Sequence, residues 1–252
     1  MRKTIFGLLF LSLLALQCEK QSDANSFQSG ETSTGQGGSL ARFTIAGNYL
    51  YTVDDKQLKV FDIQNPGAPV LKNTQDIGFE IETIYPFKDK LFIGSTTQVH
   101  IFSIADPAHP KKLSSAISPQ VLRRCDPVVA KDTVAYATLR TNGSCGGTQS
   151  ILAVYNIKDI ENPVQVNTFP VGEPYGLGYA DDVLYVCDKE QGLLLFDISR
   201  AYEPSRINVD LRDGIYVDVI PYGNNLICWV TNGIVLYDIT DNRNPQLITT
   251  IH

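Results

Sequence analysis

The sequence predicts an all-β protein, a five-bladed β-propeller of four-stranded antiparallel blades, and three observations support this. A motif of an aromatic residue, a short polar residue, an isoleucine and a later proline occurs five times. Most copies are spaced by roughly 41 residues, and two further extended runs precede each copy. Four short strands in each period of this size are typical of a propeller blade.

The motif defines the third strand of each blade and the loop after it. Its copies read FDIQNPGAP, FSIADPAHP, YNIKDIENP, FDISRAYEP and YDITDNRNP, starting at Phe61, Phe102, Tyr155, Phe196 and Tyr237. The aromatic residue and the isoleucine two positions later share one face of a strand and should be buried together. The Asp, Ser or Asn between them is expected to accept a hydrogen bond from a backbone N–H of the following turn.

The proline six positions after the isoleucine marks the fourth strand. These prolines are Pro69, Pro110, Pro163, Pro204 and Pro245. Proline cannot donate a hydrogen bond to a neighbouring strand, so the strand that it opens should be the outermost of its blade.

The first two strands of each blade are the extended runs upstream of the motif. In the first unit they are residues 41–47 and 49–55, and in the fourth unit residues 176–180 and 183–188. Gly-Asn, Lys-Asp and Asp-Asp pairs between such runs favour tight hairpins.

The repeat, written for example as LYVCDKEQGLLLFDISRAYEP, resembles the LVIVD-repeat family of bacterial and archaeal surface proteins. The resemblance covers residues 41–252 and implies a β-propeller without a catalytic motif. Five whole blades fit into this stretch without a strand shared between the first and the last. An open or partial array of blades is the alternative, although it leaves sheet edges unprotected.

The N-terminus predicts a lipid-anchored envelope protein. A basic start is followed by an apolar run of 12 residues, Ile5 to Leu16, which is too short to span a bilayer. LALQC resembles a bacterial lipobox, so residues 1–17 are expected to be a lipoprotein signal peptide and Cys18 the lipidated residue. The alternative is an ordinary signal peptide. Residues 18–40 are rich in Ser, Gly and Gln and are expected to form a flexible tether.

The expected location is therefore the bacterial cell envelope, on the outer membrane and facing the periplasm or the surface. The formal net charge of −6 disfavours nucleic acid as a partner. We expect an envelope protein or glycan as the partner, and no cofactor or metal.

A polar channel mouth is the predicted ligand-binding site. Alignment of the first strands brings together Arg42, Thr83, Asp126, Gly176 and Asp218, preceded by a ring with Glu82, Cys125 and Tyr175. The following ring is apolar and predicts a packed lower channel: Phe43, Ile84, Pro127, Leu177 and Val219. The predicted ligand-binding residues, suited to a cation, an amine or a sugar, are Arg42, Glu82, Thr83, Asp126, Tyr175, Tyr216 and Asp218. Alternatively, these charged residues only satisfy backbone groups, and a register error of one would change the face that each shows.

The five cysteines divide into three groups. The third unit is longer than the others by an insertion, LRTNGSCGGTQS, that carries Cys145 at the same end as Cys125. In an exported protein we expect these two to form a disulfide; two separate thiols are the alternative. Cys187 and Cys228 fall one position apart in adjacent blades, so they should point to opposite faces of their sheets and be buried. Cys18 is the predicted lipidation site.

The sequence favours a binding protein over an enzyme. Its three histidines, His100, His109 and His252, do not converge on the predicted map, and G-x-S-x-G does not occur. The leading hypothesis is a non-enzymatic binding propeller. The alternatives are a carboxylate-dependent glycan-active enzyme that uses Asp126 and Asp218, and a structural subunit of an envelope assembly.

Overall fold

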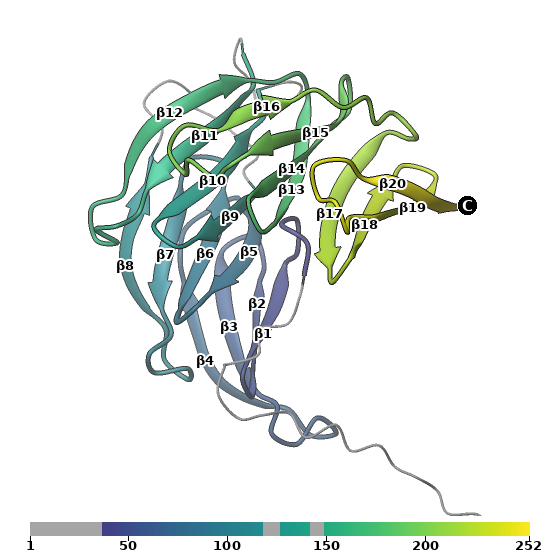
Figure 1. The fold of residues 1–252 in the computed structure, drawn as a ribbon. Helices are drawn as coiled ribbons and strands as arrows, with labels where there is room; N and C mark the ends of the chain where they lie inside the picture. Colours follow the sequence, from purple (N-terminus) through teal and green to yellow (C-terminus); the bar gives the residue numbers. More distant parts are fainter. Residues whose placement is uncertain (1–36, 118–126, 142–148) are drawn as a thin grey trace, which may run out of the picture. The chain divides into compact units, whose positions relative to one another are not determined.

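The computed structural model describes residues 37–117, 127–141 and 149–252, and these contain strands and turns without a helix. Twenty strands form five four-stranded antiparallel sheets, each in the order of the sequence (Figure 1). The predicted five-bladed arrangement is confirmed.

Each blade runs from an inner to an outer strand. Blade 1 is β1 (Phe43–Ala46), β2 (Tyr49–Val53), β3 (Gln57–Asp62) and β4 (Val70–Asp76). Blade 2 is β5 (Ile81–Phe87), β6 (Lys90–Ser95), β7 (Val99–Ser103) and β8 (Lys111–Ala116). Blade 3 is β9 (Val128–Lys131), β10 (Val134–Leu139), β11 (Ile151–Asn156) and β12 (Val164–Pro170). Blade 4 is β13 (Pro174–Ala180), β14 (Val183–Asp188), β15 (Gly192–Asp197) and β16 (Ser205–Ile207). Blade 5 is β17 (Tyr216–Tyr222), β18 (Asn225–Val230), β19 (Gly233–Asp238) and β20 (Gln246–Ile251).

The first hairpin of every blade turns through a residue with positive φ. These residues are Gly47, Lys88, Asp132, Asp181 and Gly223, with φ between 47° and 57°. Two-residue turns with positive φ match the twist of the strands that they join. The three non-glycine residues show that the turn is imposed by the strand pairing on both sides.

The loop after the third strand is braced as the motif predicts. In all five copies the short polar side chain accepts a hydrogen bond from the backbone N–H two residues later; the acceptors are Asp62, Ser103, Asn156, Asp197 and Asp238. The proline comes directly before the fourth strand, which forms the outer edge of each sheet. Both predictions are confirmed.

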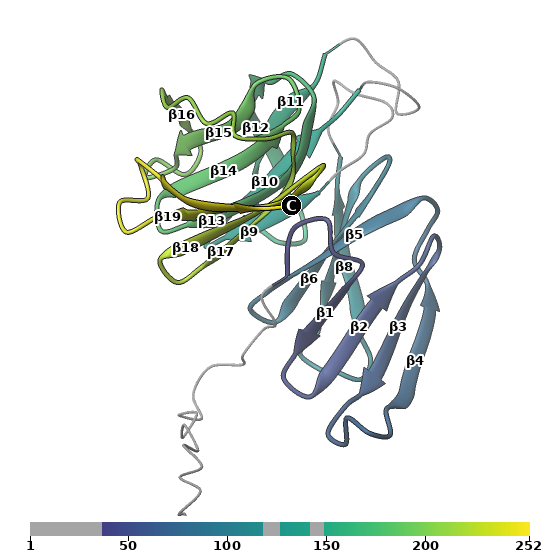
Figure 2. The same ribbon diagram turned by 90° about the vertical axis from the view of Figure 1, so that its right-hand side faces the viewer.

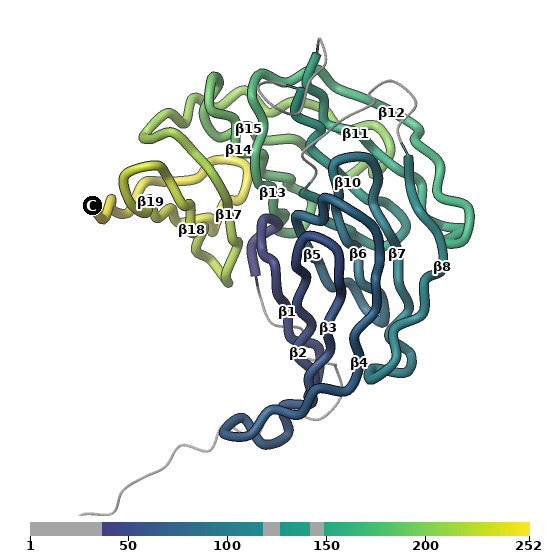
Figure 3. Tube along the Cα trace, turned by 180° about the vertical axis from the view of Figure 1, so that it is seen from behind, coloured from purple at the N-terminus to yellow at the C-terminus, as the bar shows by residue number. Residues whose placement is uncertain are grey.

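Apolar cores lie between successive blades. Four clusters of buried residues join blade 1 to 2, 2 to 3, 3 to 4 and 4 to 5. The inner strands contact one another in the same order, from β1 to β17 (Figure 3). Blades 2, 3 and 4 therefore each use one sheet face for the preceding blade and the other for the following blade.

Blades 5 and 1 do not form a fifth core among the described residues. The two middle strands of blades 2, 3 and 4 are almost wholly buried, whereas those of blades 1 and 5 alternate between buried and accessible positions. In Figure 2, the side of the molecule that carries both blade 5 and blade 1 faces the viewer. The blades thus form an open array, the alternative considered from the sequence.

Cys187 and Cys228 meet in the core between blades 4 and 5. Both are free and fully buried, and burial raises the pKa of each thiol. They belong to adjacent sheets that face each other, so the predicted opposite orientation and burial are confirmed.

Candidate functional site

The predicted mouth lies at the end of the blades where first strands begin and second strands end. Glu82 is half-buried near the start of β5, and Tyr175 is half-buried near the start of β13. Arg140 directly follows β10 and joins them at this end. We define these three residues as the mouth cluster.

Burial and two nearby cations have opposite effects on the pKa of the Glu82 carboxyl. Burial raises its pKa above the usual value, and the positive charges of Arg140 and Arg42 oppose this rise. Arg42, which is exposed, also donates from Nη2 to the carbonyl oxygen of Ile81 at 2.6 Å. The Glu82 carboxyl is thus influenced by the exposed guanidinium of Arg42 and by that of Arg140, which stacks on Tyr175. It can accept hydrogen bonds from a ligand at a modest free-energy cost.

The Tyr175 side chain is held from several directions. The Arg140 guanidinium lies over its ring, 4.0 Å from the centroid. Lys189 Nζ is 4.4 Å from the centroid but only 2.5 Å from the hydroxyl, so it acts mainly as a hydrogen-bond donor at the ring edge. The hydroxyl in turn donates to Glu173 Oε1 at 3.0 Å. An aromatic ring that is fixed in this way loses little entropy when it contacts a partner.

Asp188 is the residue that sequence reasoning missed at this end. It is fully buried, and its carboxylate accepts hydrogen bonds from four backbone N–H groups, those of Gly172, Glu173, Glu190 and Gln191, at 2.7 to 3.2 Å. It thereby fixes the entry of β13 and, with it, Glu173 and Tyr175. An Asp at the end of an otherwise apolar strand and before a Gly-containing turn is the signal that could have revealed it.

The Asp218 side chain has a structural role and does not face an open mouth. It is buried, and it accepts hydrogen bonds from Ser39 Oγ and Leu40 N at 3.3 Å each. Ser39 Oγ also accepts one from Leu177 N at 2.7 Å. Burial raises the pKa of Asp218 to about 6, and these hydrogen bonds limit the rise. Residues 38–40 therefore form a strap that ties the start of blade 1 to the inner strands of blades 4 and 5.

Two other predicted mouth residues are buried, which corrects the sequence-based placement. The Tyr216 side chain is fully buried in the core between blades 4 and 5, and its hydroxyl bonds to that of Tyr237. Thr83 is 2% exposed. β-bulges between Ile81 and Thr83 and between Tyr216 and Asp218 interrupt the first hairpins, so the residues before each bulge, Tyr216 included, depart from the register that the sequence alignment assumed.

Four predicted residues lie outside the described part of the chain: Cys18, Cys125, Asp126 and Cys145. The lipidation site, the disulfide and one acid of the mouth therefore stay predictions.

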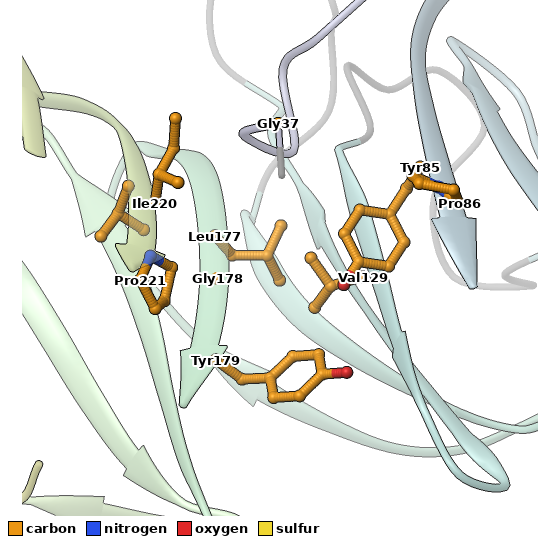
Figure 4. Close-up of a pocket in the computed structure, with 10 residues that line it drawn as sticks. Gly37, Tyr85, Pro86, Val129, Leu177, Gly178, Tyr179, Ile220 and Pro221 are labelled. Carbon is orange, nitrogen blue, oxygen red and sulfur yellow. The ribbon is translucent and has the colours of Figure 1, made fainter. Parts of the chain in front are cut away.

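Below the mouth, the channel holds a cavity of about 280 Å³ (Figure 4). Leu177 and Val219 line it together with Val129 and Pro221. The Tyr85 and Tyr179 side chains also line it, and burial raises the pKa of both hydroxyls, which share a hydrogen bond. Leu177 and Val219 of the predicted apolar ring therefore line an open cavity, where the sequence predicted a packed channel.

The remaining ring residues depart further from the prediction. Phe43 is 61% exposed, and Ile84 is buried between blades 1 and 2. The described strands of blade 1 therefore contribute little to the channel wall.

The histidines do not converge. His100 is buried and bonds to Ser115, while His109 contacts Asp106 on the surface. Within the described ranges there is no group of three or more His, Cys, Asp or Glu side chains that could hold a metal ion. The same ranges include no helix that is long and apolar enough to cross a membrane.

Comparison with known families matches residues 37–76 to the LVIVD repeat. This stretch is blade 1 with the strap, so the resemblance stated from the sequence is confirmed there. No curated protein is significantly similar to the chain in sequence.

Solved structures confirm the propeller fold. A protein of unknown function from Desulfotomaculum acetoxidans superposes with a TM-score of 0.66 at 8% identity, covering 87% of this chain and 69% of that one. The periplasmic gluconolactonase PpgL of Pseudomonas aeruginosa gives 0.60 at 14%, covering 82% and 67%. The designed protein Ika8 gives 0.57 at 12%, covering 83% and 60%. This chain thus spans about 60% of the length of Ika8 and somewhat more of the other two.

Proposed function

We propose that this propeller, whose first blade is an LVIVD repeat, is a non-enzymatic binding protein of the bacterial cell envelope. Its mouth cluster of Glu82, Arg140 and Tyr175 would bind an envelope protein or glycan. A lipid on Cys18 would hold it at the membrane. The apolar segment before Cys18 and the polar residues between Cys18 and the strap support the anchoring.

The observation that carries the binding proposal is the fixed Tyr175 ring between Arg140 and Lys189. Tyr and Arg dominate the energetics of protein interfaces, and both also contact sugars and acidic groups. The half-buried Glu82 adds a hydrogen-bond acceptor beside them. Such a cluster, held by second strands and buried Asp188, is preorganised for binding.

The structure offers no support for the alternative enzyme built on Asp126 and Asp218. The Asp218 carboxylate is buried and already accepts bonds from Ser39 and Leu40. The fold shared with PpgL, at 14% identity, carries no activity to this chain.

The test uses the full chain produced with its own N-terminus in a bacterial host. Wild type should take up a labelled fatty acid and sediment with membranes, and Cys18→Ser should do neither. A glycan array of peptidoglycan and lipopolysaccharide fragments, and cross-linking to envelope proteins, then probe the mouth. We expect Arg140→Ala and Tyr175→Ala to weaken binding by at least about tenfold, or about 1.4 kcal/mol.

The matched control is Arg200→Ala, which removes an exposed arginine paired with Glu203 in the β15–β16 loop, at the end of blade 4 opposite the mouth. It should bind as wild type does. Equal binding by wild type and both mouth variants would contradict the proposed site. Turnover of an array sugar that is lost in Glu82→Gln would replace the binding proposal with an enzymatic one.

A further inference from the structure

Among the described residues, the open array leaves two apolar sheet faces without a neighbouring blade. On blade 5, Trp229 of β18, Ile234 of β19 and Ile251 of β20 lie side by side in the strand register, and they are 55%, 38% and 52% exposed. On blade 1, Phe43 and Ile45 of β1 are 61% and 36% exposed. We call these the blade 5 face and the blade 1 face.

The blade 5 face is equivalent to four faces that are buried elsewhere in the molecule. The register pairs Trp229 with Ile234 as it pairs Cys187 with Leu193 in blade 4. Positions equivalent to Trp229 are Val53, Gly94, Thr138 and Cys187, and those equivalent to Ile234 are Leu58, Val99, Leu152 and Leu193. All eight are buried, and each pair lies against the next blade. The blade 5 face is thus built to receive a blade.

The chain's own blade 1 fits this face poorly. In the four closed interfaces the position of Trp229 holds a smaller residue, and the position of Phe43 holds Ile84, Val128, Leu177 or Val219. At the open seam both partners are large aromatic residues. The strap ties the start of blade 1 to Asp218, so the spacing of blade 1 from blade 5 is restrained by this contact and is not set by the two rings. Closure would overpack the interface, which is destabilising.

A blade 1 from another molecule has no such restraint. It can approach the blade 5 face at whatever spacing the two aromatic rings set, because no strap joins the two molecules. The contact would continue the series of blade-to-blade interfaces that the chain already makes four times.

We propose that the blade 5 face and the blade 1 face form a self-association surface, on which blade 5 of one copy packs against blade 1 of a second copy. The contact is head-to-tail, since the two surfaces differ. Exposed apolar patches of this kind commonly mark protein interfaces. It is distinct from the mouth cluster, whose residues Glu82, Arg140 and Tyr175 belong to blades 2, 3 and 4.

The single tryptophan makes the proposal directly measurable. Trp229 fluorescence and molecular mass by light scattering are followed for purified full-length protein over a range of concentrations. At low concentration we expect a monomer with red-shifted, readily quenched emission. At high concentration the mass should at least double while the emission shifts to the blue.

Two single variants test the head-to-tail geometry. Trp229→Thr introduces the residue of blade 3, and Phe43→Thr truncates the opposite face; each alone should stay monomeric. Mixed in equal amounts they should form a dimer and no larger species, because each variant retains the face that the other has lost. Val164→Thr, which truncates an equally exposed side chain on β12, is the control and should associate as wild type does.

Three outcomes overturn the proposal. A monomer with exposed Trp229 at every concentration excludes self-association. Blue-shifted emission in a monomer at the lowest concentration means that blade 1 of the same chain closes the seam. Failure of the variants to form a mixed dimer, while wild type associates, excludes the head-to-tail contact.

Discussion

Two kinds of aspartate show how burial decides the role of one residue type. Asp62, Asp197 and Asp238 lie at exposed turns, where hydrogen bonds to the carboxylate lower the pKa of each. Asp218 also accepts backbone hydrogen bonds, but it is buried at the strap, and loss of hydration outweighs them. The sequence motif predicts the first role because the partner is two residues away. It does not predict the second, because Ser39 and Leu40 are distant in the chain.

The raised pKa of Asp218 predicts a pH-dependent stability of defined sign. The folded value of about 6 lies above the ordinary value of 3.8, so the folded state holds the proton more tightly. The contribution of this group therefore decreases as the pH rises from about 4 to about 6, by on the order of 2–3 kcal/mol at most. Asp218→Asn should remove this term. We expect the free energy of unfolding of the variant minus that of wild type, both from urea unfolding, to be more positive at pH 7.5 than at pH 4.

Asp218→Ala serves as the comparison for that measurement. It also removes the ionisation, but it leaves Leu40 N and Ser39 without their acceptor, so it should destabilise the protein at both pH values. A constant difference between Asp218→Asn and wild type across this range would contradict the raised pKa.

At the scale of strands and loops, a tyrosine of the second strand links blades 1, 3 and 4 each to the loop of the next blade. Tyr51, Tyr136 and Tyr185 donate to the carbonyl oxygens of Pro107, Ala201 and Asn242, at 2.7 to 2.9 Å. These acceptors occupy the same position in the motif, five residues after its aromatic residue. In blade 2 the position holds Phe92, and Ser114 of the outer strand donates to Ile160 instead, at 2.5 Å.

This linkage predicts the effect of Tyr185→Phe. The ring stays in the core between blades 4 and 5, but the Asn242 carbonyl oxygen loses its donor. We expect a loss of about 1–2 kcal/mol in the free energy of unfolding, measured in urea. Tyr222→Phe, at an exposed position of the β17–β18 hairpin, is the control and should change little. No loss in Tyr185→Phe would mean that water replaces the hydroxyl.

The elements were predictable from the sequence to the extent that their causes are local. The aromatic-to-proline motif placed the third and fourth strands, and the turn pairs placed the first hairpins. The mouth was less predictable, since the bulges before Thr83 and Asp218 shift the side chains by one position. Arg140 and Asp188 escaped because they lie just beyond the end of β10 and at the end of β14, where no repeat column marks them.

At the scale of the whole molecule, the repeat determines which blades are neighbours but not whether the series closes. Four interfaces follow from one pattern of small and large residues. The fifth depends on exceptions to it, namely Trp229 where other blades carry Val, Gly, Thr or Cys, and Ile227 where they carry Tyr or Phe. Such exceptions in a single blade do not alter the repeat. The open seam is therefore evident only from the exposed positions of blades 1 and 5.

An open series predicts graded stability across the five blades. Blades 2, 3 and 4 each bury both faces, while blades 1 and 5 each bury one, so the end blades should open locally at lower free energy. In hydrogen–deuterium exchange of dilute protein, amides of β2, β3, β18 and β19 should exchange sooner than those of β10, β11, β14 and β15. A closed ring would protect all middle strands alike. Raising the protein concentration should protect blades 1 and 5 selectively in wild type but not in Trp229→Thr, because only the self-association surface gains a partner. Uniform protection in dilute wild type would therefore refute the open seam itself, independently of whether the copies associate.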